Sequence, residues 1–388
     1  MKHLESRQDL ALFGAPPAFG EPLHVGRPNM GNRESFLAYV NDIFDQRWLT
    51  NNGPLVHEFE QKVADYLGVK HCVAMCNGTI ALEIAIRALE LKGEVIVPSY
   101  TFIATAHALQ WQEITPVFAD IDPITHNLDP AAVLRMITPR TTGIVGVHLW
   151  GRSSPVDELQ SIANEHGLKL MFDAAHAFGC SHQGQMIGNF GDCEIFSFHA
   201  TKFFNTFEGG AIVTNDDDLA IKMRLMKNFG FSGNDNVVYP GTNGKMTEVA
   251  AAMGLVNLNA LDEFVEANRC NHKLYSSRLN VIKGLSVLSY DERELNNYQY
   301  VVVEVLDSFP VSRDEIVQAL QAENVLARRY FWPGCHNMLP YRAFYPHAGL
   351  VLPNTKIVSD RVIVLPTGAT IGKTEIETIG NIFEILSR

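Results

Sequence analysis

The sequence predicts an α/β protein with a mainly parallel central sheet, helices on both faces of that sheet, and a smaller α+β domain after it. Short apolar runs between residues 69 and 214 alternate with helix-like segments, a pattern typical of parallel strands that are buried on both faces. A long helical pattern starts at Thr247 and precedes a shorter second set of strands and helices. Hydrophobic residues make up 46% of the 388 residues, so the chain can bury a core in each part.

The elements of the larger part follow in chain order. Residues 1–33 are rich in Pro and Gly and are expected to form an extended N-terminal arm. A helical pattern begins at Glu34, and an amphipathic helix ends at Gly68. The expected strands are Val69–Cys76, Glu94–Pro98, Thr115–Asp120, Gly143–Leu149, Leu168–Phe172, Cys193–Phe198 and Gly210–Thr214, with helices at Thr79–Leu91, Ile103–Trp111, Pro130–Ile137 and Pro155–His166. Residues 34–265 are therefore assigned to a large α/β domain.

The helical pattern from Thr247 to about residue 280 is expected to link this domain to the second one. After it, the sequence indicates strands at Tyr298–Val305, Val325–Tyr330 and Arg361–Leu365 and helices at Ser312–Ala322 and Lys373–Leu386. Residues 266–388 are accordingly assigned to a small C-terminal α+β domain.

Composition excludes several classes of function. The 31 basic and 43 acidic residues give a net charge of −12, and the absence of a long basic run argues against a nucleic-acid partner. No stretch approaches the ~18 apolar residues of a membrane span, and the acidic residues near the N-terminus argue against a secretory signal. The six cysteines include no CxxC pair, which favours free thiols in a reducing cytoplasm over a metal site or a disulfide framework.

A first candidate for chemistry is the segment Asn77-Gly78-Thr79, which follows an apolar strand and opens a helix. The start of a helix offers unpaired N–H groups, and Gly78 would allow an anion to approach the backbone closely. Taken alone, a helix cap by Asn77 or Thr79 is the simpler explanation.

Two further residues lie at expected strand ends. Asp173 would need a cationic partner if it were buried there. Lys202, if desolvated, could lose its proton and react as an amine nucleophile. Each alone is more simply a loop carboxylate or a surface charge. Together with an anion site and an aromatic such as Tyr100 or Phe102, they match what pyridoxal phosphate requires: a lysine for its aldehyde, an acid for its ring nitrogen, an anion site and a flat apolar group.

The motifs CNGT, VPSYTFIATA, FADIDP, HLWG, FDAAHAFG, FSFHATK and EGGAIVT occur in this order, and the chain resembles the sugar aminotransferases of the DegT/DnrJ/EryC1/StrS family from PLHVGRPN to RRYFWPGCH. The resemblance implies a fold-type I enzyme that uses pyridoxal 5′-phosphate, with pyridoxamine phosphate as the form that carries the amino group. It also implies a nucleotide-linked keto sugar as substrate and a homodimer whose two chains share each active site.

The resemblance also implies roles for individual residues. Lys202 corresponds to the catalytic lysine that binds the cofactor's aldehyde, and its presence argues against the dehydratases of this family, which have His at that position. The implied cofactor contacts are Asp173 at the ring nitrogen, His176 at the phenolic oxygen, Phe102 on the ring, Gly78, Thr79 and Ser197 at the phosphate, and Asn243 at the phosphate of the neighbouring subunit. The implied substrate residues are Trp48, Arg329, Tyr330 and His336. No metal is expected.

FSFHATK and the N-terminal arm resemble the branch that aminates C4 of dTDP-4-keto-6-deoxyglucose with glutamate as donor. The expected product is dTDP-4-amino-4,6-dideoxyglucose, a deoxyamino sugar of O-antigen and other polysaccharides. The alternatives are an aminotransferase for a C3 ketone or for a GDP- or UDP-sugar, and a non-catalytic regulatory member of the family, which would be expected to lack the lysine or the acid. A nicotinamide-dependent oxidoreductase would require GxGxxG where this chain has CNGT.

Overall fold

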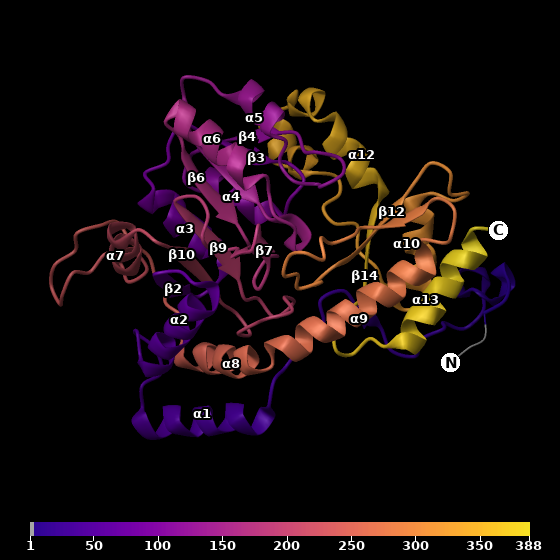
Figure 1. The fold of residues 1–388 in the computed structure, drawn as a ribbon, viewed down its shortest axis with the longest axis horizontal. Coiled ribbons are helices and arrows are strands. Elements are labelled where there is room, and N and C mark those ends of the chain that lie inside the picture. The colour runs from indigo at the N-terminus through magenta and orange to yellow at the C-terminus, as the bar shows by residue number, and fades with distance from the viewer. Residues whose placement is uncertain (1–3) are drawn as a thin grey trace.

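The computed structural model describes residues 4–388. Within these residues the central sheet has seven strands in the order β2-β10-β9-β6-β5-β3-β4 (Figure 1). Its strands are β2 (His71–Met75), β3 (Glu94–Pro98), β4 (Thr115–Ala119), β5 (Thr141–Val147), β6 (Lys169–Asp173), β9 (Cys193–Ser197) and β10 (Gly210–Thr214). All neighbours pair in parallel except β10, which is antiparallel to both β2 and β9. The predicted mainly parallel sheet is therefore confirmed.

Helices cover both faces of this sheet, and the alternation of side chains along each strand decides which helices each residue meets. On one face, Met171 of β6 and Ile195 of β9 pack in a cluster with α3 (Gly78–Ala88), α4 (Ile103–Gln110) and α7 (Asp217–Met226). On the other face, Leu170 and Phe172 of β6 pack against α5 (Pro130–Met136) and α6 (Val156–His166). On that face α2 (Pro54–Leu67) covers the β2 side of the sheet. The hairpin β7 (Ser181–His182) and β8 (Gln185–Met186) lies outside the central sheet.

The single long helix expected from residue 247 is two helices, α8 (Glu248–Asn259) and α9 (Leu261–Leu279). They meet at Ala260, whose φ of −106° and ψ of 8° are not helical. Figure 1 shows α8 and α9 running from the central sheet to the C-terminal part of the chain. The expected domain boundary at residue 265 falls inside α9, and the division into domains stays a prediction. Helix α1 (Arg33–Gln46) contacts α8 and buries Ile43.

The C-terminal part is built on an antiparallel sheet in the order β11-β12-β14. Its elements are β11 (Leu285–Val287), β12 (Val301–Val305), β14 (Val362–Leu365), α10 (Arg313–Ala322), α11 (Tyr341–Phe344), α12 (Pro353–Arg361) and α13 (Lys373–Leu386). The strand expected at residues 325–330 is wrong in length: β13 is Val325–Leu326, and it pairs in parallel with β1 (Leu23–His24). Beyond this pairing, Arg328 forms an isolated bridge with Val364 of β14, and Arg328 and Tyr330 line the central cavity.

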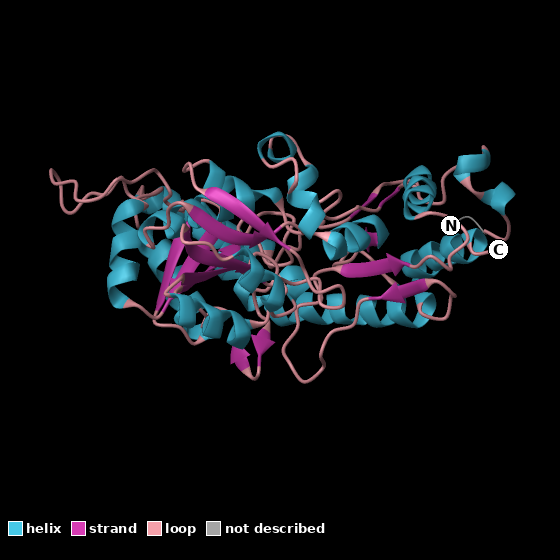
Figure 2. Cartoon of the chain, turned by 90° about the horizontal axis from the view of Figure 1, so that it is seen from above, coloured by secondary structure: helices cyan, strands magenta, loops and turns pink. Residues whose placement is uncertain are grey.

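The N-terminal segment packs into the C-terminal part. Leu10 and Phe19 belong to a buried cluster with residues of α9, α10 and α13, and the N–H groups of Ala11 and Ala18 donate to the carboxylate of Glu323. Figure 1 shows α13 and the indigo N-terminal segment at the same end of the molecule, which is the end that carries the C-terminus in Figure 2. The N-terminal segment, expected as an extended arm, is thus held against the C-terminal part by the burial of its apolar side chains. Among residues 4–388, no helix combines the length and apolar character needed to cross a bilayer.

Candidate active site

A cavity of about 310 Å³ lies at the carboxyl ends of β2, β5, β6 and β9, between the central sheet and residues of the C-terminal part. This is the edge at which parallel α/β sheets bind ligands. The cavity brings together seven of the eight residues expected to contact a cofactor, namely Gly78, Thr79, Phe102, Asp173, His176, Ser197 and Lys202. The eighth, Asn243, does not line it.

One end of the cavity is built to accept an anion. The side chain of Asn77 caps α3 by accepting from the N–H of Ile80 at 2.8 Å, so the expected cap is present. The adjoining Gly78 lies so close to Ser197 that a Cβ on it would be 3.0 Å from the Ser197 Cβ atom. Likewise, a Cβ on Gly210 would be 2.8 Å from the backbone nitrogen of Gly78. These glycines bring the helix start, the Ser197 hydroxyl and Thr79 close together, and such a cradle can accept an anion.

The cavity also holds the buried carboxylate of Asp173 at the end of β6. Its Oδ2 atom accepts from the hydroxyl of Thr105 at 2.8 Å, and its Oδ1 atom accepts from the N–H of Ala175 at 3.1 Å. Burial raises the pKa of Asp173 despite these donors and the nearby Lys202. A cationic ligand beside this buried carboxylate would stabilise its ionised form. A protonated ring nitrogen is a cation of this kind.

His176 is buried among aromatic rings and is held in its neutral form. Its Nδ1 atom accepts from the N–H of Trp150 at 3.3 Å, so the proton of the neutral ring lies on Nε2. The ring stacks on Trp150 and Phe331 and lies 4.6 Å from the ring of Tyr300, measured between centroids. Burial and the charge of Lys202 keep the pKa of His176 well below its ordinary value. His176 can therefore donate one hydrogen bond to an oxygen anion at neutral pH.

Lys202 leaves the sheet edge in the turn after β9, where its N–H donates to the carbonyl of His199. Its Nζ atom lies 3.5 Å from the hydroxyl of Tyr300, which comes from the C-terminal part. Burial lowers the pKa of Lys202 from 10.5 to about 8, although Asp173 opposes this shift. About a tenth of the amine is therefore unprotonated at pH 7, far more than for an ordinary lysine, and can react with an aldehyde.

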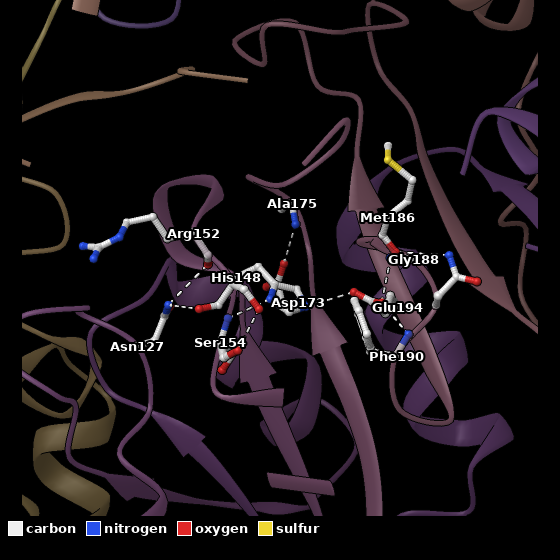
Figure 3. A network of polar contacts seen from close by, with 12 residues as sticks. Asn127, His148, Arg152, Ser154, Asp173, Ala175, Met186, Gly188, Phe190 and Glu194 are labelled. Carbon is white, nitrogen blue, oxygen red and sulfur yellow. Dashed lines mark hydrogen bonds and ion pairs between the residues drawn. The ribbon is translucent and has the colours of Figure 1, made fainter. Parts of the chain in front are cut away.

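A second polar network connects the segment after β5 with β6 and β9 (Figure 3). His148 follows β5, and its Nε2–H donates to Glu194 of β9 at 3.0 Å, while its Nδ1 atom accepts from the N–H of Ser154. Glu194 also accepts from the N–H groups of Gly188 and Phe190 at 2.7 and 2.8 Å. The N–H of His148 donates to the carbonyl of Asp173 at 3.0 Å. This network joins the strand ends that carry the functional side chains.

The residues expected to contact the substrate separate into two groups. Tyr330 lines the cavity, whereas Trp48, Arg329 and His336 do not. Arg329 donates to Asp314 at 3.0 Å, and His336 is buried with its Nδ1 atom 2.7 Å from the hydroxyl of Ser99. Trp48 is 49% exposed. Substrate roles for these three stay predictions, and this chain's own geometry supports direct contact only for Tyr330.

Asn243 is exposed and lies beside the end of β2, where its carbonyl accepts from the thiol of Cys76 and its side chain accepts from Lys245 at 2.6 Å. This position suits a residue that faces another chain. Its role in a neighbouring active site stays a prediction.

Sequence reasoning did not single out Tyr300, Arg328, Phe331 or Thr105. Arg328 could have been found, because residues 328 and 330 lie on the same side of an extended chain and Tyr330 was already expected at the site. Arg328 does line the cavity, with its guanidinium 5.1 Å from the ring centre of Tyr330. Tyr300 carries no comparable signal, because its contact with Lys202 joins residues 98 positions apart.

Comparisons with known proteins agree with this geometry. The model of the DegT/DnrJ/EryC1/StrS aminotransferase family matches residues 31–384. A Shigella dysenteriae protein named dTDP-4-amino-4,6-dideoxy-D-glucose transaminase is 39% identical over 361 residues, which cover 92% of this chain and 97% of that protein. A Caulobacter vibrioides protein named GDP-perosamine synthase is 38% identical over 325 residues, covering 82% and 86%. The crystal structure of DesI in the presence of its TDP-sugar product has a TM-score of 0.94 and 50% identity, covering 98% of this chain and 97% of that chain.

Proposed function

The chain belongs to the DegT/DnrJ/EryC1/StrS aminotransferase family of pyridoxal-phosphate-dependent enzymes, and we propose that it transfers an amino group from glutamate to C4 of dTDP-4-keto-6-deoxyglucose. The product would be dTDP-4-amino-4,6-dideoxyglucose, the sugar in the names of two relatives that are 39% and 37% identical. Relatives named GDP-perosamine synthase make a GDP-linked sugar the second candidate.

The residues present in the cavity fit pyridoxal phosphate. The cradle of Gly78, Thr79 and Ser197 would hold the phosphate, and Asp173 would hold the ring nitrogen. Phe102, 59% exposed at the cavity, offers its ring as a stacking surface. Lys202 is the amine that would hold the aldehyde, and His176 would donate its Nε2–H to the phenolic oxygen.

When bound, the cofactor supplies an aldehyde that carries the amino group and a ring that withdraws electrons from the reacting carbon. The chain then has to move one proton in each half of the reaction. The Nζ atom of Lys202 is the group placed to do so, because burial brings its pKa to about 8. Lys202 would take the proton from the α-carbon of glutamate and deliver a proton to C4 of the sugar. Because the proton would arrive from one fixed side, it would determine the configuration at C4 of the sugar.

The observation that carries this proposal is the convergence of an anion cradle, a buried acid and a lysine of lowered pKa in one cavity. The test is to incubate the purified protein with pyridoxal phosphate, ¹⁵N-labelled glutamate and dTDP-4-keto-6-deoxyglucose. Mass spectrometry should show one ¹⁵N atom in the sugar nucleotide, and NMR should place it on C4. Transfer to a GDP- or UDP-linked sugar but not to the dTDP-linked sugar would overturn the substrate assignment.

We also propose a homodimer. Helix α1 lies at the edge of the molecule, next to α8 (Figure 1). Its Leu37 and Phe44 side chains are 46% and 72% exposed. The following Leu49 is 60% exposed. A second copy would cover this apolar surface and could bring its Asn243 to the phosphate cradle. Sedimentation equilibrium of the loaded protein should give twice the monomer mass, and Phe44→Glu should shift it toward the monomer.

The proposed location is the cytoplasm. All six cysteines are free thiols, and four of them are buried, which suits a reducing compartment. Fractionation of cells that produce the protein should recover it with cytoplasmic markers.

A further inference from the structure

Thr105 is a buried residue that does not line the cavity but touches a residue that does. It lies in the first turn of α4, and its side chain is shielded from solvent, with 1% exposure. Its Oγ1 atom is 2.8 Å from the Oδ2 atom of Asp173, a contact between residues 68 positions apart. The other carboxylate oxygen accepts from the N–H of Ala175 at 3.1 Å (Figure 3). Two donors from different elements thus clamp the carboxylate.

The direction of the hydrogen bonds follows from the chemistry of hydroxyl groups. A hydroxyl has one proton to donate, and an ionised carboxylate can only accept, so Thr105 donates to Asp173. The Oγ1 atom of Thr101 lies 3.2 Å from that of Thr105. Because the proton of Thr105 is already engaged, Thr101 is the donor in this second contact. The two threonines therefore form a chain of hydroxyl groups that ends on the carboxylate.

We propose that Thr105 is a positioning residue for the ring nitrogen of pyridoxal phosphate, acting by orienting the Asp173 carboxylate and favouring its ionised form. This inference rests on the role of Asp173 given under the proposed function. One bond from Thr105 and one from Ala175 restrain the rotation of the carboxylate, and Asp173 itself lines the cavity. Phe102, the residue expected on the face of the ring, is the N-cap of the same helix. The first turn of α4 would therefore position both the Phe102 ring that stacks on the cofactor and the Asp173 carboxylate that contacts its ring nitrogen.

The test separates the effect on the ring nitrogen from any general loss of structure. Thr105→Val removes the hydroxyl and keeps the branched shape, whereas Thr105→Ser keeps the hydroxyl. The matched control is Thr355→Val in α12, because the hydroxyl of Thr355 also donates to a buried carboxylate, Asp120, at 2.8 Å. Dissociation constants are measured by absorbance titration for pyridoxal phosphate and for its analogue that has C–H in place of the ring nitrogen.

A hydrogen bond to a charged group contributes enough to change binding about 10-fold or more. Thr105→Val should therefore weaken binding of pyridoxal phosphate about 10-fold or more and binding of the analogue less than about 3-fold. Thr105→Ser should restore the preference for pyridoxal phosphate, and Thr355→Val should leave that preference unchanged. Equal weakening of both ligands by Thr105→Val, or the same change of preference in Thr355→Val, would overturn the inference.

Asp173→Asn distinguishes this inference from the proposal on which it rests. If Asp173→Asn abolishes the preference for pyridoxal phosphate and Thr105→Val does not reduce it, the role of Thr105 alone is wrong. If Asp173→Asn leaves the preference intact, Asp173 does not contact the ring nitrogen, and both assignments are overturned.

Discussion

The Nζ atom of Lys202 and the hydroxyl oxygen of Tyr300 lie 3.5 Å apart, although Lys202 lies between β9 and β10 of the central sheet and Tyr300 directly precedes β12 of the C-terminal sheet. Tyr300 is buried, and burial holds the pKa of its hydroxyl well above the ordinary value. The lysine amine therefore faces a neutral hydroxyl. With no anion at that contact, burial lowers the pKa of Lys202 to about 8.

The first prediction concerns the pH dependence of Lys202. Because the folded chain disfavours the ammonium form, the reactive amine should appear as pH rises through about 8, well below the ordinary 10.5. The rate of acylation of Lys202 in cofactor-free protein, followed by peptide mass spectrometry, should show a midpoint near pH 8. Saturating pyridoxal phosphate should block the reaction. A midpoint near 10.5 would contradict the assignment.

The second prediction concerns the phosphate cradle. In Gly210→Ala, the new Cβ would lie 2.7 Å from the carbonyl carbon of Asn77, so β10 or the start of α3 must move. Overpacking of this kind costs about 1–3 kcal/mol. We expect a lower melting temperature and weaker binding of both pyridoxal phosphate and inorganic phosphate. Gly20→Ala is the control, because a Cβ at Gly20 meets no atom within 4 Å; equal effects of the two variants would rule out a local cause.

The third prediction compares neighbouring arginines. Arg328 lines the cavity, and among residues 4–388 no carboxylate pairs with it. Arg329, in contrast, donates to Asp314 and stacks on Trp332. A charge-assisted hydrogen bond contributes about 1.5–3 kcal/mol, so Arg328→Gln should raise KM for an anionic substrate roughly 10- to 100-fold. Arg329→Gln should raise it less. Steady-state kinetics with each substrate in turn gives the KM of both variants. A larger increase in KM for Arg329→Gln than for Arg328→Gln would contradict the assignment of Arg328 to the cavity.

The fourth prediction concerns stability. Glu194→Ala would leave the buried His148 Nε2–H and the N–H groups of Gly188 and Phe190 without their acceptor. Each unpaired buried donor costs about 1–3 kcal/mol, so urea unfolding should show a loss of about 3 kcal/mol or more. Glu165→Ala, at an exposed position of α6, should change stability by less than about 0.5 kcal/mol. A similar loss in both variants would show that the network contributes nothing specific.

The expected strands of the central sheet and the start of α3 agree with the structure because they depend on local patterns. Apolar runs between helices indicate buried parallel strands, and Asn77-Gly78 marks a helix start through contacts within four residues. The strand expected up to Tyr330 ends at Leu326, and among the described residues 327–330 only Arg328 forms a bridge, to Val364 of β14, a pairing partner that the local pattern does not reveal. The helix expected from Thr247 divides at Ala260, a residue whose own propensity favours helix, so helix propensity at that position did not indicate the break.

By itself, the sequence determined the α/β class, the order of most elements and the strand ends that carry Asp173, Ser197 and Lys202. Periodicity and turn chemistry act over a few residues, and a parallel sheet brings the carboxyl ends of its strands to one edge. The tertiary structure alone decided that Tyr300 meets Lys202, that Thr105 holds Asp173, and that Arg329 pairs with Asp314. It also decided that the N-terminal segment completes the C-terminal core. The physical reason is that such contacts join distant parts of the chain, and their geometry follows from how whole elements pack.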